Sequence, residues 1–144
     1  MKSLFVLRVV GKELIPFMLL FALYVQFHGD FGPGGGFQAG VIIAAALIFY
    51  AIIFGLPTAR KAVPDGVIEK MMAAGVLIYA GVGVAGLLLG GNFLDYFVLD
   101  PDPVHGQERG IFWVEVGVAV TVSGVMLKIF SMFADRGRDR GRDE

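Results

Sequence analysis

The stretch FQAGVIIAAALIFYAIIFGL, residues 37–56, has no charged side chain in any of its twenty positions. An α-helix needs about 20 apolar residues to cross the hydrocarbon core of a bilayer. Residues 71–90 form a second stretch without charge, and residues 111–133 form a third that is interrupted by Glu115 and Lys128. These three stretches predict transmembrane helices.

A fourth candidate span lies near the N-terminus, over residues 12–27. Lys12, Glu13 and Pro16 interrupt its start, and the proline is tolerated if the helix proper begins just before it. Basic residues before an apolar run are also typical of secretory signals. No small-residue cleavage site follows this run, so we interpret it as an uncleaved span. Four spans occupy about 80 of the 144 positions, which leaves no room for a soluble domain.

The composition agrees with a membrane protein and excludes several kinds of chemistry. Apolar residues make up 56% of the chain and charged residues 17%, so the apolar excess has to face lipid or partner subunits. The absence of cysteine excludes disulfides, thiolate nucleophiles and iron–sulfur ligation. The net charge of −1 gives no argument for a nucleic-acid partner. We expect an all-α integral membrane protein with one transmembrane domain, residues 1–135, and without a cofactor or metal.

The distribution of basic residues predicts the orientation of the chain. In a four-span arrangement only Arg109 falls on one side, and all other Lys and Arg residues fall on the opposite side. These residues are Lys2, Arg8, Lys12, Arg60, Lys61, Lys70, Lys128, Arg136, Arg138, Arg140 and Arg142. Because an excess of Lys and Arg marks the cytoplasmic side, we expect both termini in the cytoplasm. Residues 136–144 alternate Arg, Asp and Gly, which predicts a charged, disordered cytoplasmic tail.

Three ionisable residues are candidates for a role at membrane depth. Glu115 and Lys128 are 13 positions apart, about 20 Å along a helix, so they cannot pair within it. Lys128 is interpreted either as a side chain that snorkels to the headgroups or as a contact. Glu115 is either an interfacial carboxylate or a group on an ion path or at a subunit contact. Glu13, close to Pro16, is a weaker candidate of the same kind.

The most unusual stretch is FHGDFGPGGGFQAG, residues 27–40. Proline with three glycines favours a tight turn that returns the chain to the membrane. Two interpretations remain open: a flexible hairpin turn, or a backbone that approaches a neighbouring chain closely because glycine has no Cβ. Two histidines, His28 and His105, lie in separate loops, and their spacing does not support a metal site.

This stretch carries a resemblance to a known family. His28-Gly29 followed by Pro33-Gly34-Gly35-Gly36-Phe37, leading into an Ala/Ile-rich span, resembles the B subunit of the Mrp-type multisubunit cation/proton antiporters. The similarity extends along nearly the whole chain, with four spans, this motif at the start of the second, and a basic cytoplasmic loop after it. The residues expected to form a function-sensitive motif are His28, Gly29, Asp30, Pro33, Gly34, Gly35, Gly36 and Phe37, and by the resemblance Pro33 and Phe37 are the positions that carry over from the family.

The resemblance implies an accessory subunit rather than an enzyme. The family forms complexes of up to seven different subunits in the bacterial cell membrane, which exchange Na⁺ or another monovalent cation for protons, driven by the proton-motive force. The B subunit would be needed for assembly and activity, and the other subunits would be its partners together with the lipid bilayer. Small residues at helical spacing, such as Gly40 and Ala44 or Gly117 and Thr121, fit docking onto such subunits. The alternative is a membrane scaffold subunit of an antiporter-related redox complex, such as a membrane-bound hydrogenase.

Overall fold

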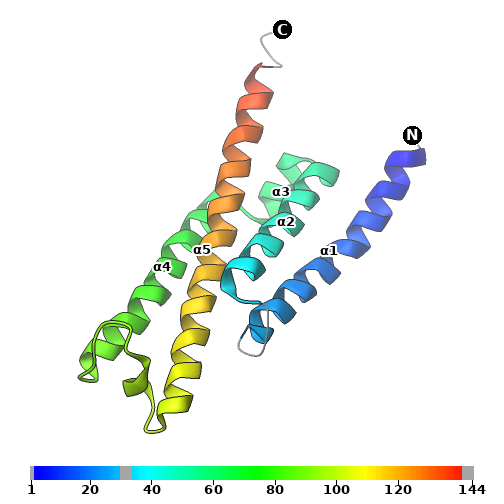
Figure 1. Ribbon diagram of the computed structural model, residues 1–144. Helices are drawn as coiled ribbons and strands as arrows, with labels where there is room; N and C mark the ends of the chain where they lie inside the picture. Colours follow the sequence, from blue (N-terminus) through cyan, green and yellow to red (C-terminus); the bar gives the residue numbers. More distant parts are fainter. Residues whose placement is uncertain (1, 30–33, 141–144) are drawn as a thin grey trace.

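The computed structural model describes residues 2–29 and 34–140, and every regular element in this part of the chain is helical (Figure 1). The long helices are α1 (Lys2–His28), α2 (Gly36–Phe54), α4 (Asp65–Leu88) and α5 (Pro103–Arg140). The connections contain two short elements, α3 (Leu56–Ala62) and the 3₁₀ helix η1 (Tyr96–Leu99). The expected all-α class is confirmed.

Three of these helices are long and apolar enough to cross a membrane. They cover Gly36–Phe54, Asp65–Leu88 and Pro103–Arg136, and each contains or closely matches one of the three apolar stretches of the sequence. The multi-pass membrane character is therefore confirmed. The stretch 12–27 lies inside α1, whose N-terminal half carries the exposed residues Arg8, Lys12 and Glu13.

The C-terminal tail expected over residues 136–144 is in part a continuation of α5. This helix extends to Arg140, and residues 141–144 lie outside the described part of the chain. The segment mixes Arg and Asp with glycine, yet the helix continues through Gly137 to Arg140. The charged end of the chain therefore begins as a helix that projects beyond the apolar part of α5.

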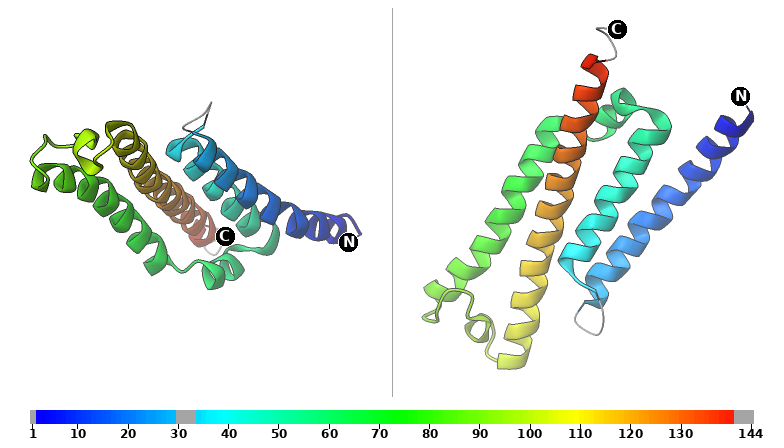
Figure 2. Two further views of the ribbon diagram at one scale, coloured as in Figure 1. Left: turned by 90° about the horizontal axis from the view of Figure 1, so that it is seen from below. Right: turned by 45° about the horizontal axis from the view of Figure 1, so that its top comes forward.

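The long helices form an open row. α5 packs against α4 on one side and against α2 on the other, and α1 packs mainly on α2 (Figure 2). Along the helix axes, the start of α1, the end of α5 and α3 lie at one end of the row, which is the top in Figure 1. The 3₁₀ helix η1 and the start of α5 lie at the opposite, lower end. A row of this kind buries few side chains, so its two broad faces are available to lipid or to other subunits.

The interior is built mainly from small residues. Its apolar centre is a cluster of Ala44, Ile68 and Leu127, contributed by α2, α4 and α5. Ser123 of α5 is 1% exposed, and its hydroxyl lies 2.7 Å from the Ala119 carbonyl oxygen and 3.1 Å from the Gly40 carbonyl oxygen of α2. The helices are thus held together by close backbone approach, as is common in membranes, rather than by large interdigitating side chains.

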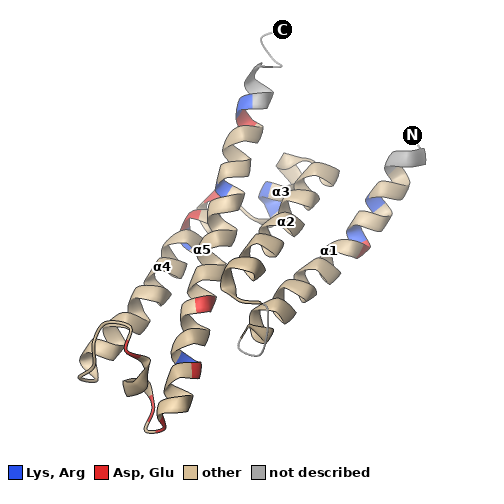
Figure 3. Ribbon diagram, in the orientation of Figure 1, with Lys and Arg blue, Asp and Glu red and all other residues tan. Residues whose placement is uncertain are grey.

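Most charged residues lie near the upper and lower ends of the helices, and the middles of α2 and α4 carry none (Figure 3). At the end with the termini, Arg60 of α3 pairs with Asp65 of α4 and with Asp135 of α5. The hydrogen bond that the Arg60 guanidinium donates to the Asp135 carboxylate raises the pKa of Arg60 above its usual value, so this group stays charged. The short connection between α2 and α4 is therefore tied to α5.

Candidate functional site

The glycine-rich turn between α1 and α2 closes onto α5 at Glu115. Gly29 follows the last residue of α1, Gly34 and Gly35 precede the first residue of α2, and Glu115 lies in the first half of α5. These residues come from three helices that lie next to one another in the row. We call Gly29, Gly34, Gly35, Gly36 and Glu115 the glycine cradle.

The turn is fixed to the end of α1 by backbone geometry. Gly35 has a φ of 128° and a ψ of 177°, a combination that is open to glycine and strained for other residues. In this conformation its N–H donates to the Val25 carbonyl oxygen over 3.2 Å. A Cβ added at Gly34 would lie 2.6 Å from the same oxygen. Gly34 and Gly35 therefore lie directly against the last turn of α1.

The absence of side chains at these glycines makes room for Glu115. A Cβ at Gly36 would overlap the Glu115 carbonyl oxygen and would stand 2.9 Å from its Cα, so the backbones of α2 and α5 touch here. The carboxylate occupies the remaining space. Its Oε1 is 2.8 Å from the Cβ position of Gly35, and its Oε2 is 3.0 Å from that of Gly29. Gly36 is thus required because backbone atoms of Glu115 occupy the position of a Cβ, whereas Gly35 is required mainly by its positive φ.

The electrostatic setting of Glu115 follows from this packing. The carboxylate is half-buried and lies beside the N-terminus of α2. The dipole of an α-helix places partial positive charge at that end, which stabilises a nearby carboxylate. The structure thereby connects two features that the sequence analysis treated separately, the Pro-Gly-Gly-Gly turn and the acidic residue of the last span.

The remaining motif residues lie around the cradle. The His28 ring is half-buried and stacks on Tyr24 one turn earlier in α1, with ring centroids 5.2 Å apart. Phe37, in the first turn of α2, is 61% exposed and points away from the interior of the chain. Asp30 and Pro33 lie outside the described residues.

The two other ionisable candidates are not part of this site. Glu13 lies exposed in the N-terminal half of α1. The Lys128 amine is 2.7 Å from the Glu69 carboxylate of α4, so this side chain reaches a neighbouring helix. Glu115 and Lys128 remain about 20 Å apart along α5. The three residues that we predicted as ion-path or subunit contacts are therefore not brought together by the fold.

Sequence analysis missed Gln26. This residue is 7% exposed on α1, and neither its amide nitrogen nor its amide oxygen has a hydrogen-bond partner among the described residues. It precedes the glycine turn by one helical turn and follows Val25, which accepts the bond from Gly35. The available signal was an amide in an otherwise apolar run. Nearby, the Phe27 and Phe112 rings stack at 5.8 Å and hold the end of α1 against α5.

The contacts at this site are mainly steric, between glycine backbones near the start of α2 and Glu115 of α5. Within residues 2–29 and 34–140, no group of three or more His, Asp or Glu side chains is arranged to hold a metal ion. The cradle holds the start of α2 against α5, and the Phe37 ring in the first turn of α2 is exposed. This arrangement can hold a neighbouring protein in a defined position.

Comparison with known proteins places the chain in a family context. A family model described as a domain related to the MnhB subunit of Na⁺/H⁺ antiporters matches residues 6–128. The chain is 34% identical over 133 residues to the B subunit of a Na⁺/H⁺ antiporter from Alkalihalophilus pseudofirmus, covering 85% of this chain and 92% of the relative. It is 31% identical over 127 residues to a putative antiporter subunit, mnhB2, of Staphylococcus haemolyticus, covering 86% and 89%. With the B subunit of a Na⁺/H⁺ antiporter from Bacillus subtilis it shares 28% identity over 130 residues, covering 81% and 88%.

Proposed function

Because this chain belongs to the family of MnhB subunits of Na⁺/H⁺ antiporters, we propose that it is an accessory subunit of a multisubunit antiporter in a bacterial membrane. The complex exchanges Na⁺ for protons and is driven by the proton-motive force. The observation that carries this proposal is the family match over residues 6–128, which includes the glycine cradle and most of the apolar part of each long helix. The relatives named above are antiporter subunits, which favours the antiporter over a hydrogenase scaffold.

An accessory role fits the distribution of ionisable groups. Glu115 and Lys128 lie about 20 Å apart along α5, and Lys128 is already engaged with Glu69. The uncharged middles of α2 and α4 lie on either side of α5. A continuous path for protons or cations across the membrane therefore needs groups from other subunits, and the open faces of the row provide the surfaces on which those subunits dock.

We propose that α1 is a fourth span and that both termini lie in the cytoplasm. α1 has 27 residues, about 40 Å of helix, and is uncharged from Leu14 to Phe27. The start of α1 and the end of α5 lie at the same, upper end of the helices in Figure 1, as an even number of membrane crossings requires. That end also carries Arg60, Lys61 and Lys70, and the positive-inside rule assigns it to the cytoplasm.

The glycine cradle gives this accessory role a physical basis. It holds the start of α2 against α5, so that Phe37 has a fixed place in the first turn of that helix. An aromatic ring on a rigid support is an effective anchor for another protein chain because little conformational entropy is lost on binding. We propose that the motif residues His28 to Phe37 act through this contact.

The proposal is tested by identifying the proteins that associate with the chain. The tagged protein is expressed at its natural level, extracted in a mild detergent and purified, and the companions are identified by mass spectrometry. We expect other antiporter subunits in fixed ratio. Companions that carry iron–sulfur clusters or a nickel site would assign the chain to a redox complex, and a chain that purifies alone would contradict the subunit role.

A further inference from the structure

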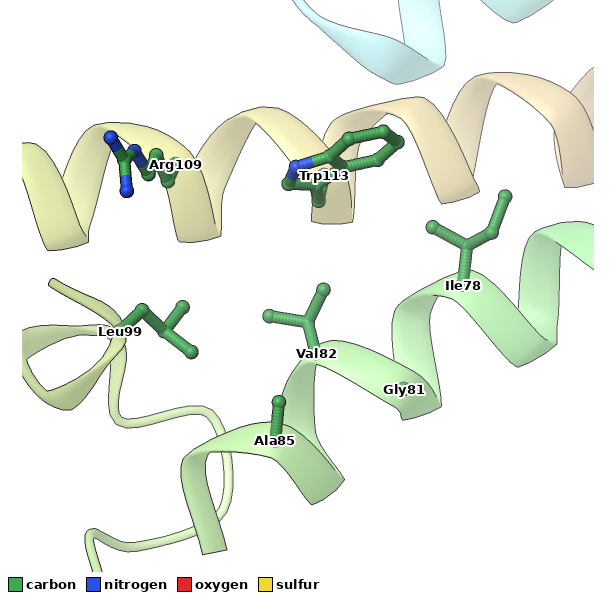
Figure 4. Close-up of a pocket in the computed structure, with 7 residues that line it drawn as sticks. All are labelled: Ile78, Gly81, Val82, Ala85, Leu99, Arg109 and Trp113. Carbon is green, nitrogen blue, oxygen red and sulfur yellow. The ribbon is translucent and has the colours of Figure 1, made fainter. Parts of the chain in front are cut away.

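No further inference is drawn: the strongest candidate, the apolar groove between α4 and α5 that Arg109 and Trp113 help to line (Figure 4), carries none, because Arg109 is already paired with Asp100 and nothing in the structure shows what covers the groove.

Discussion

Gly36 is the glycine of the cradle with the least room. A Cβ at this position overlaps the Glu115 carbonyl oxygen, and backbone atoms cannot move aside as a flexible side chain can. Gly36→Ala should therefore separate α2 from α5 and destabilise the fold by about 1–3 kcal/mol, the usual range for overpacking. The measurement is the midpoint of thermal unfolding of the purified complex. Gly66→Ala, at a position where a Cβ meets nothing, is the control and should leave the midpoint unchanged or raise it.

Phe37 makes a different prediction because its side chain is 61% exposed in the isolated chain. Truncation of an exposed side chain usually changes stability by less than about 0.5 kcal/mol, so Phe37→Ala should leave the fold of the chain intact. If the ring is an anchor, the same change should reduce the amount of assembled complex and its Na⁺/H⁺ exchange severalfold. Ile52→Ala, which truncates a 69% exposed side chain in the same helix, should have little effect. Normal assembly and exchange in Phe37→Ala would refute the anchor.

The sequence identified the residues of the cradle but did not indicate that they are in contact in the fold. Gly34, Gly35 and Gly36 stood out by composition, and Glu115 by its charge within an apolar stretch. Their contact depends on the register between α2 and α5, which is set further along by the close approach of Gly40 to Ala119. This register is a tertiary property that composition and periodicity do not contain. Gln26 was missed for a similar reason, because a single amide does not indicate on its own which side of a helix is buried.

At the scale of elements, the apolar stretches predicted α2, α4 and α5 because each is uninterrupted over about the thickness of a bilayer. The sequence did not indicate α3, which has seven residues and contains Pro57, although proline at the start of a helix is a known signal. Hydropathy also gave no reason to begin α4 at Asp65 or α5 at Pro103. These extensions are polar: Asp65 at the start of α4 pairs with Arg60, and at the start of α5 the Val104 N–H donates to the Asp102 carboxylate.

The contact between α4 and α5 gives a prediction at this scale. A Cβ at Gly75 would overlap the Thr121 hydroxyl of α5 and would lie 2.5 Å from the Gly117 carbonyl oxygen. Gly75→Leu should force the two helices apart and destabilise the fold by more than about 1–3 kcal/mol, since a large side chain is inserted against backbone. The yield of folded complex after extraction in detergent measures this effect. Gly66→Leu on the same helix is the matched control, and equal yields would contradict the close packing.

At the scale of the whole molecule, the open row predicts a protein whose topology can be measured directly. The chain has no cysteine, so single cysteines introduced in place of Ser3 and Arg140 report on one site each. Both should react with a membrane-impermeant thiol reagent only from the cytoplasmic side. A cysteine in place of Val104, which is 65% exposed at the opposite end, should react only from outside. Reaction of Ser3→Cys from outside in intact cells would place α1 differently and exclude four spans.

The most direct test of the accessory role is Na⁺-dependent proton exchange in inside-out membrane vesicles that are energised by respiration. Three preparations are compared: the complete complex, the complex without this protein, and this protein alone. We predict exchange only in the complete complex, because the row lacks a continuous path of its own and the other subunits need it for assembly. Exchange by this protein alone, or undiminished exchange without it, would contradict the account.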